Sequence, residues 1–237
     1  MKSIKLSIVA TALLLMGAAG VKAQTADEII DKHVKAVGGA ENWKKINTMK
    51  MTGAINAGGT EIPVTITYLQ NKAMKVEFSM NGMTGYQIVT TKGGWAFNPM
   101  AGQTKPEPIP EEMVKESQDQ LDIQDKLIDY KAKGSKVVFL GKDDVEGTEC
   151  YKLKVTTSNG KEETMYIDAS NYYHIRSVSK IKANGKEMEQ TANYSNYQKL
   201  PEGIVFPMNI DEGNGPVALK SVEINKPVDE AIFTPKS

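Results

Sequence analysis

The sequence predicts a mainly β protein with some helix. We expect one curved antiparallel sheet of roughly eleven strands wrapped around a central helix, with a short helix at the N-terminus. Three observations support this fold. Apolar and polar residues alternate with a period of two through most of the chain, Gly and Asn-Gly pairs separate the alternating runs, and one amphipathic segment stands between two sets of strands.

The first set of strands follows Asn47. Its clearest run is 74–80, where Met74, Val76, Phe78 and Met80 alternate with Lys75, Glu77 and Ser79. The Asn81-Gly82 pair favours a tight hairpin, and the segment 94–99, which contains Trp95 and Phe97, closes the first half. Strands joined this briefly form an antiparallel meander.

The second set of strands follows the amphipathic segment. We expect strands at 136–141, 148–157, 162–168, 174–183, 186–198, 204–211 and 217–225, with turns at Asn159-Gly160 and Asn184-Gly185. So many strands do not fit a flat sheet, which must therefore curl or close. A two-sheet sandwich would show the same alternation, but it leaves no place for a helix of about 20 residues between strands.

The central helix is expected at 110–130. Pro110 can occupy a first helical turn, and Glu111 and Glu112 suit the positive end of the helix dipole. At about 100° per residue, its apolar residues fall on one arc. Ser117, Gln120 and Gln124 interrupt that arc. They indicate either a plug or lid that must release, or residues that meet water or backbone groups at a helix edge.

The N-terminal helix is expected at 25–37, because Thr25 can cap it and Gly38-Gly39 can end it. A second short helical piece at 40–46 carries Trp43. We interpret His33 as a residue of the helix face rather than a metal ligand, because no second ligand lies near it in the sequence.

Residues 1–23 resemble a secretory signal peptide. Two lysines precede an apolar run, and Val21-Lys22-Ala23 suits cleavage after Ala23; an uncleaved membrane anchor is the alternative. The mature chain, 24–237, is then a single exported domain. No Cys follows the apolar run to accept a lipid.

Charge and motifs exclude several classes of function. Without the three lysines of the signal peptide, the 29 basic residues fall to 26 against 29 acidic residues, a formal net charge of −3, which disfavours a nucleic-acid partner. Cys150 is the only cysteine and lies in a strand pattern, as a packing residue would. The sequence has no recognisable catalytic, metal-binding or cofactor-binding motif, so we expect neither an enzyme nor a cofactor or metal.

Several segments together resemble the LolA/LolB-like fold of periplasmic lipoprotein carriers and the outer-membrane lipoprotein-sorting family. They are ADEIIDKHVKAVGG, GGWAFNP, VEGTECYKLKVTT, YIDASNYYHIRSVSK and NYSNYQKLPEGIVFPMNI. The resemblance covers nearly all of the mature chain and implies an unclosed half-barrel whose concave apolar face, covered by helices, receives acyl chains. The carrier proper uses an arginine on an early strand to hold its closed form, whereas the matching segment 69–73 has none and Arg176 is the only arginine here. The resemblance therefore supports the fold more strongly than it supports lipoprotein as the cargo.

The function expected from this resemblance is a periplasmic carrier or binding protein, a monomer, for lipid or lipoprotein acyl chains. An inner- or outer-membrane protein would be its partner. Methionine and aromatic residues on the dry face suit flexible lipid chains, although they could equally fill an ordinary barrel core. The alternative function is an envelope-stress or protein-interaction module that uses the same fold without lipid transfer. The expected ligand-binding residues are Val64, Ile66, Tyr68, Met74, Val76, Phe78, Met80, Trp95, Phe97, Met113, Leu121, Leu127 and Ile128.

Overall fold

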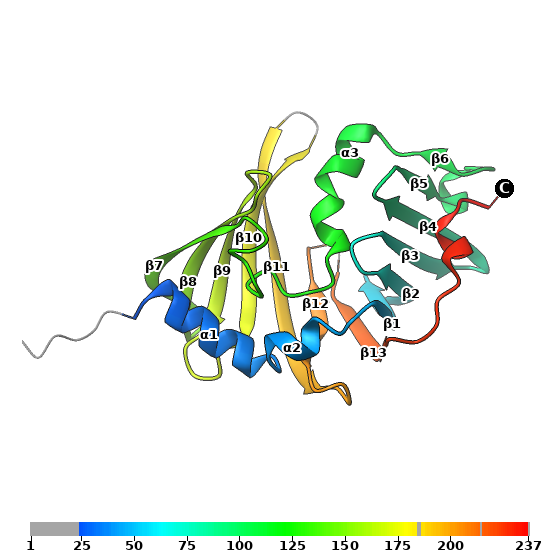
Figure 1. Cartoon of the computed structure of the whole chain (residues 1–237). Helices are drawn as coiled ribbons and strands as arrows, with labels where there is room; N and C mark the ends of the chain where they lie inside the picture. Colours follow the sequence, from blue (N-terminus) through cyan, green and yellow to red (C-terminus); the bar gives the residue numbers. More distant parts are fainter. Residues whose placement is uncertain (1–23, 184–185, 214, 237) are drawn as a thin grey trace, which may run out of the picture.

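The computed structural model describes residues 24–183, 186–213 and 215–236. The expected signal peptide and the expected turn at 184–185 lie outside these residues. In the described part of the chain, 13 strands form one sheet in the order β6-β5-β4-β3-β2-β1-β13-β12-β11-β10-β9-β8-β7 (Figure 1). The strands are β1 (Thr48–Ala57), β2 (Thr60–Leu69), β3 (Ala73–Met80), β4 (Met83–Thr90), β5 (Gly94–Phe97), β6 (Glu107–Pro108), β7 (Lys136–Val145), β8 (Thr148–Thr156), β9 (Glu162–Asp168), β10 (His174–Ala183), β11 (Lys186–Lys199), β12 (Val205–Asp211) and β13 (Val217–Ile224).

The sheet is built in two runs that meet in its middle. Strands β1 to β6 proceed to one edge, the chain crosses to the opposite edge at β7, and β8 to β13 return until β13 pairs with β1, with Met49 opposite Ile224. Every paired neighbour is antiparallel, and β6 and β7 end the order without meeting. The expected unclosed antiparallel half-barrel is therefore confirmed. The strand number exceeds the expected eleven or so, and β6, with two residues, is too short to carry a period.

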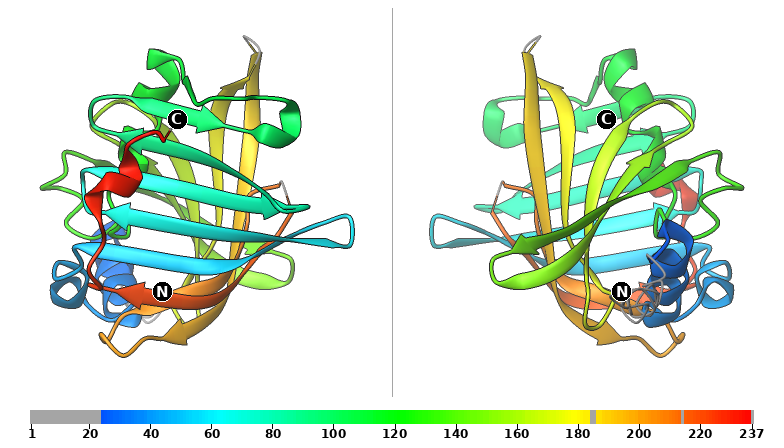
Figure 2. Two further views of the ribbon diagram at one scale, coloured as in Figure 1. Left: turned by 90° about the vertical axis from the view of Figure 1, so that its right-hand side faces the viewer. Right: turned by 90° about the vertical axis from the view of Figure 1, so that its left-hand side faces the viewer.

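The two halves of the sheet face each other across a hollow. In Figure 2 the strands β1 to β5 run across the view while β10 and β11 run up it, as the accumulated right-handed twist of a long sheet requires. Helices α1 (Ala26–Ala36) and α2 (Ala40–Trp43) lie along one rim, and α3 (Glu111–Glu116) lies between the halves (Figure 1). The remaining helical turns are the 3₁₀ elements η1 (Pro99–Ala101), η2 (Gln118–Leu121) and η3 (Glu230–Phe233).

The two N-terminal helices form where the sequence predicts them. Thr25 Oγ1 accepts the backbone N–H of Glu28 at 3.2 Å, and the Glu28 carboxylate accepts the backbone N–H of Thr25 at 3.2 Å, a reciprocal cap. The chain leaves α1 through Gly38, whose φ is +102°. A Cβ at Gly38 would lie 2.2 Å from the carbonyl oxygen of Gly203, so glycine lets α1 approach the start of β12.

The single long helix expected at 110–130 is wrong. Helix α3 ends at Glu116, η2 adds one short turn, and the chain from Asp122 to Ser135 is neither helix nor strand. Polar side chains end the helix by bonding to backbone groups instead. The Gln118 amide donates to the carbonyl of Thr90 at 3.1 Å, and the Asp125 carboxylate accepts the N–H of Leu127 at 2.8 Å. Such side chains offer the backbone an alternative to helix, which an apolar period does not register.

The two faces of the sheet bury separate cores. On the concave face, Met49, Met51 and Ile224 pack with Trp43 of α2. On the opposite face of β3 to β5, Ala73 and Ile88 pack under Phe233 of η3. The C-terminal segment therefore covers part of the outer surface.

Candidate functional site

The hollow of the half-barrel is bridged by residues 117–133, which we call the strap. In Figure 1 it descends from α3 and passes in front of β11 and β10 toward β7. Its apolar side chains point inward: Leu121 packs with Met74 and Val89, whereas Leu127 and Ile128 are fully buried. The strap thus fills much of the hollow with the protein's own side chains.

Direct hydrogen bonds fix residues 121–123 of the strap to the turn between β2 and β3. The backbone N–H of Asn71 donates to the carbonyl of Leu121 at 2.8 Å. The side-chain amide of Gln70 donates to the Asp122 carboxylate at 2.7 Å and accepts the N–H of Ile123 at 2.7 Å. The segment at which the family resemblance lacks an arginine therefore holds the strap with an uncharged glutamine.

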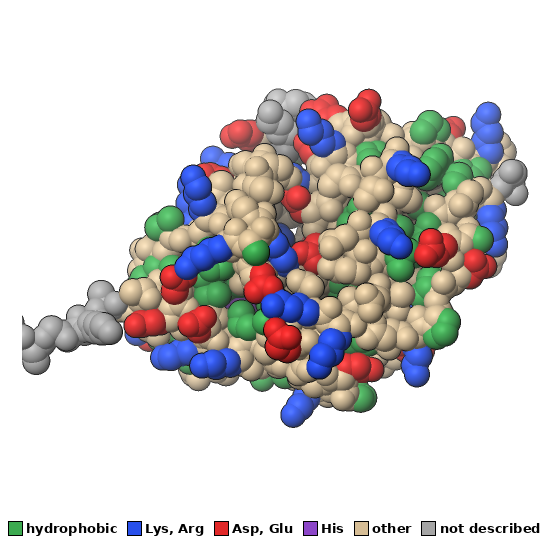
Figure 3. Space-filling model, viewed as in Figure 1, with side chains coloured by type: hydrophobic (Ala, Val, Ile, Leu, Met, Phe, Trp, Pro, Cys, Tyr) green, Lys and Arg blue, Asp and Glu red, His purple; other side chains and the backbone are tan. Residues whose placement is uncertain are grey.

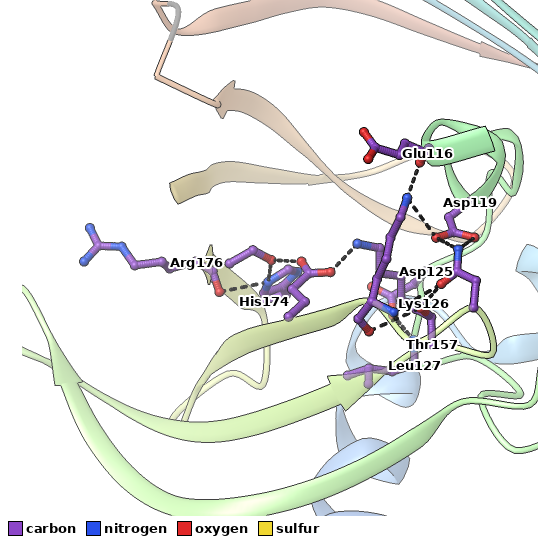
Figure 4. Close-up of polar contacts among 12 residues, drawn as sticks. Glu116, Asp119, Asp125, Lys126, Leu127, Thr157, His174 and Arg176 are labelled. Carbon is purple, nitrogen blue, oxygen red and sulfur yellow. Dashed lines mark hydrogen bonds and ion pairs between the residues drawn. The ribbon is translucent and has the colours of Figure 1, made fainter. Parts of the chain in front are cut away.

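The elbow between α3 and η2 contacts the β8–β9 turn (Figure 4). The Asp119 carboxylate accepts from the Asn159 amide at 2.8 Å and lies 3.4 Å from the Lys161 ammonium, which also bonds to the carbonyl of Glu116. The Asp119 side chain is half-buried and those of Asn159 and Lys161 are exposed, so these contacts add little to stability and can break at small cost.

The buried anchor of the strap is a pair formed by Asp125 and His33. His33 is fully buried on α1, its Nδ1 lies 2.7 Å from the carbonyl oxygen of Tyr172, and its Nε2 lies 3.2 Å from Asp125 Oδ2. Burial disfavours the imidazolium, but the Asp125 carboxylate outweighs it and raises the pKa of His33 above its ordinary value. Conversely, burial would raise the pKa of Asp125, but the His33 charge lowers it. His33 is thus a helix residue whose role is to hold the strap.

A second polar chain ties the strap to β9 and β10. The Lys126 ammonium bonds to one carboxylate oxygen of Glu163, and the hydroxyl of Ser177 donates to the other (Figure 4). Burial would raise the pKa of Glu163, yet Lys126 lowers it, so this carboxylate stays ionised. Ser177 and His174 are connected in turn, since His174 Nε2 lies 2.9 Å from Ser177 Oγ.

The direction of the hydrogen bonds among Glu163, Ser177 and His174 does not match that of a hydrolytic triad. His174 Nε2 lies 2.9 Å from the carbonyl oxygen of Arg176, which can only accept, so Nε2 carries the proton. A protonated Nε2 cannot take a proton from Ser177, and the acidic residue binds the serine rather than orienting the imidazole. Burial lowers the pKa of His174 to about 4, which keeps the ring neutral. The arrangement can bind polar atoms but is not poised for nucleophilic attack.

Beneath the strap lies a cavity of about 230 Å³. Apolar side chains from α2, β12 and the strap form one part of its wall, and polar side chains from β9, β10, β11 and the strap form the other. The lining residues are Val37, Trp43, Ile123, Gln124, Asp125, Lys126, Glu163, Met165, His174, Tyr194, Tyr197, Val205, Phe206, Pro207 and Ile210.

The sequence placed the ligand-binding residues on the first half of the sheet, whereas the cavity lies over the second half. Val64, Ile66, Tyr68, Met74, Val76 and Phe78 share the concave face of β2 and β3, as their register shows, but none of them lines the cavity. Leu121 covers Met74, and Met80 continues the same strand face toward the hairpin. Their part in ligand binding stays a prediction.

Other expected lining residues lie elsewhere. Trp95 pairs with Ile88 and packs in the cluster under Phe233, and Phe97 contacts Tyr86 on that same outer face. Met113 is half exposed on α3. The structure therefore moves Trp95 and Phe97 off the concave face, because the strand entering from the Gly93-Gly94 turn has a register that the alternation alone does not fix.

The polar half of the cavity was missed in the sequence, although one signal for it exists. Glu163 shares its strand face with Met165 and Ile167, both of which are buried. A carboxylate on the dry face of a strand needs a partner, which Lys126 supplies from a segment far away in the sequence.

Comparison with known proteins agrees on the fold. Neither protein-family profiles nor functionally characterised sequences give a match. Among solved structures, the chain is similar to a LolA superfamily protein from Nitrosomonas europaea, with a TM-score of 0.53 and 14% identity over 89% of this chain and 97% of the other. It is also similar to a putative outer membrane lipoprotein-sorting protein domain from Vibrio parahaemolyticus, with a TM-score of 0.50 and 14% identity over 87% and 95% of the two chains.

These similarities confirm that the chain has the open half-barrel fold of the LolA superfamily. At this level of identity they establish the fold and no particular ligand. Each helix in the described residues is too short or too polar to cross a bilayer. On the face viewed in Figure 3, acidic and basic side chains are interspersed, as on a solvated surface.

Proposed function

We propose that this protein is a periplasmic carrier or binding protein that holds lipid or lipoprotein acyl chains in the hollow beneath the strap. The observation that carries the proposal is the cavity between the strap and the concave sheet, whose wall includes Trp43, Phe206 and Ile210. The LolA-like fold and the signal-peptide pattern of residues 1–23 support the same class and the same compartment.

Burial of methylene groups would supply the affinity. At about 0.8 kcal/mol per methylene, a chain of roughly sixteen carbons offers about 12 kcal/mol before ordering costs are subtracted. The cavity of about 230 Å³ is smaller than the roughly 300–1,000 Å³ typical of ligand pockets. A long chain therefore enters only when the strap moves and Ile123 gives up its place.

The contacts of the strap suit such movement. Its anchors at Asp119 and Lys126 are polar pairs with partners on other elements, which can exchange for water, whereas the buried Asp125–His33 pair must separate at a larger cost. A protein-interaction module remains the second candidate. It is favoured by the burial of Leu127 and Ile128, since a hollow filled by the protein's own side chains has less need of a ligand.

Native mass spectrometry of residues 24–237, purified without detergent and then incubated with palmitate, tests the proposal. We expect one bound acyl mass per chain. Ile210→Glu places a charge in the cavity wall and should abolish that mass, whereas Val138→Glu, at an exposed position on the edge strand β7, should retain it. A clean unbound mass for the wild type would favour the interaction module. Equal retention of the acyl mass by both variants would show that the ligand does not bind in this cavity.

A further inference from the structure

The polar half of the cavity carries an acceptor that the protein leaves unused. His174 is 8% exposed, lines the cavity, and uses Nε2–H on the Arg176 carbonyl and Ser177 Oγ. A neutral histidine protonated at Nε2 has a bare lone pair at Nδ1. None of the hydrogen bonds of the described residues involves Nδ1 of His174, and unlike His33 Nε2 this atom is not fully enclosed, so a ligand in the cavity can reach it.

A phenol stands beside this acceptor. The Tyr194 ring lies 4.6 Å from the His174 ring, between centroids, and also lines the cavity. Burial raises the pKa of Tyr194, and the neighbouring Ser177 hydroxyl lowers it by less, so the phenol stays protonated and can donate its hydrogen to a ligand. Tyr197, by contrast, is committed, because its hydroxyl donates to the His174 carbonyl.

The charges around the polar half of the cavity favour an uncharged head group over an anionic one, although an acyl chain with either head group can still bury its methylenes. Asp125 and Glu163 each contribute a carboxylate to the wall, and Lys126 is its one ammonium among the described lining residues, already bonded to Glu163. A ligand carboxylate or phosphate would have to displace Glu163 from Lys126 and leave that carboxylate buried beside it. A hydroxyl group needs no such exchange, since it can donate to His174 Nδ1 and accept from Tyr194.

We propose that the polar end of this cavity is a head-group subsite for an uncharged, hydroxyl-bearing amphiphile, such as a monoacylglycerol, with His174 and Tyr194 as its recognition residues. The inference rests on the proposed function, because the apolar part of the ligand would occupy the wall formed by Trp43, Phe206 and Ile210. The small volume of the cavity suits a short acyl chain while the strap is closed.

Isothermal titration of residues 24–237 with three amphiphiles of equal chain length tests the head-group preference. The probes are monooctanoylglycerol, octanoate and octyltrimethylammonium. We expect monooctanoylglycerol to bind roughly tenfold more tightly than either charged probe, the advantage of about one satisfied hydrogen bond. Equal or tighter binding of octanoate or the ammonium compound would overturn the subsite while leaving acyl binding intact. Failure of all three probes, together with failure of palmitate, would reject both proposals.

Matched variants assign the effect to the two residues. Tyr194→Phe keeps the ring and removes the hydroxyl, so we expect a loss of roughly tenfold for monooctanoylglycerol and no change for octanoate. Tyr166→Phe serves as the control, because Tyr166 lies on β9 with its ring 5.5 Å from the Lys152 ammonium, away from the cavity. His174→Phe should also lose the preference. If both His174→Phe and Tyr194→Phe bind monooctanoylglycerol as the wild type does, the subsite is refuted, and circular dichroism of each variant verifies that it is folded.

Discussion

Nε2 of His33 lies 3.2 Å from Oδ2 of Asp125, and this contact joins the first helix of the domain to the strap that covers the hollow. In the sequence, the whole first half of the sheet, β1 to β6, lies between these two residues. Because both side chains are largely removed from water, either charge would be unfavourable without the other. Separating the two residues therefore costs free energy.

Removing one charge of this pair should loosen the strap. For Asp125→Asn we expect a loss of about 3 kcal/mol in the free energy of unfolding, because His33 is left buried without its counter-charge. Chemical denaturation monitored by circular dichroism measures it. Asp129→Asn is the control: Asp129 pairs with Lys44 at an exposed position and has a φ of +50°, which asparagine tolerates, so its loss should stay below about 0.5 kcal/mol. Equal losses would mean that the His33 contact does not anchor the strap.

The same pair predicts a pH window for the strap. The folded pKa of His33 is raised above 6.5, so its contribution is complete below pH 6.5 and is lost as the pH rises through the folded pKa. Asp125 contributes above pH 3.8 and is lost as the pH falls through its lowered pKa. Hydrogen exchange of amides 122–128, corrected for intrinsic rates, should therefore be slowest between about pH 4 and 6.5. Protection that keeps increasing well above that window would contradict the ion pair.

His174 should act on stability in the opposite direction. Its folded pKa of about 4 lies below the ordinary 6.5, so the unfolded chain binds the proton first and stability falls as the pH drops from 6.5 to 4. The part due to His174 is about 3 kcal/mol across that interval. Denaturation of the wild type and of His174→Gln at several pH values measures the difference in slope. Parallel curves would show that the ring is not buried and neutral.

The close approach of α1 to β12 can be tested at two adjacent glycines. Gly38→Ala would drive a Cβ to 2.2 Å from the Gly203 carbonyl oxygen, whereas Gly39→Ala meets nothing within 4 Å; both residues have positive φ. We expect about 1 kcal/mol from the backbone conformation in each variant and a further loss of about 2 kcal/mol or more in Gly38→Ala. Thermal unfolding distinguishes them. Equal melting temperatures would show that the helix and strand can separate at no cost.

The sequence predicts the sheet better than the segment that crosses it. Strand alternation and Asn-Gly turns are local signals, so the curved antiparallel sheet and the cap at Thr25 follow from the residues themselves, whereas the open edges of the sheet are implied only by the family resemblance. The strap does not, because Gln118 and Asp125 bond to backbone groups and the His33 partner lies elsewhere in the chain. An apolar arc records which side chains are buried and not whether the backbone between them is helical.

The position of the cavity does not follow from the sequence for a similar reason. Alternation identifies the concave faces of β2 and β3, but the position of the cavity depends on which half of the sheet the strap fills. Leu121 closes the hollow over the first half, whereas the strap leaves space over Phe206 and Ile210 in the second. Which half of the sheet the strap covers is decided by tertiary packing, and no residue pattern within one strand predicts it.

In the proposed carrier, a bound acyl chain takes the place of the strap over the cavity. Hydrogen–deuterium exchange with and without saturating palmitate tests it directly, with the β3–β4 hairpin as an internal reference. We predict faster exchange of amides 122–128 in the bound protein, because the Asp125 and Lys126 contacts must open, and unchanged exchange in the hairpin. Bound palmitate with unaltered exchange in the strap would show that the acyl chain does not displace the strap.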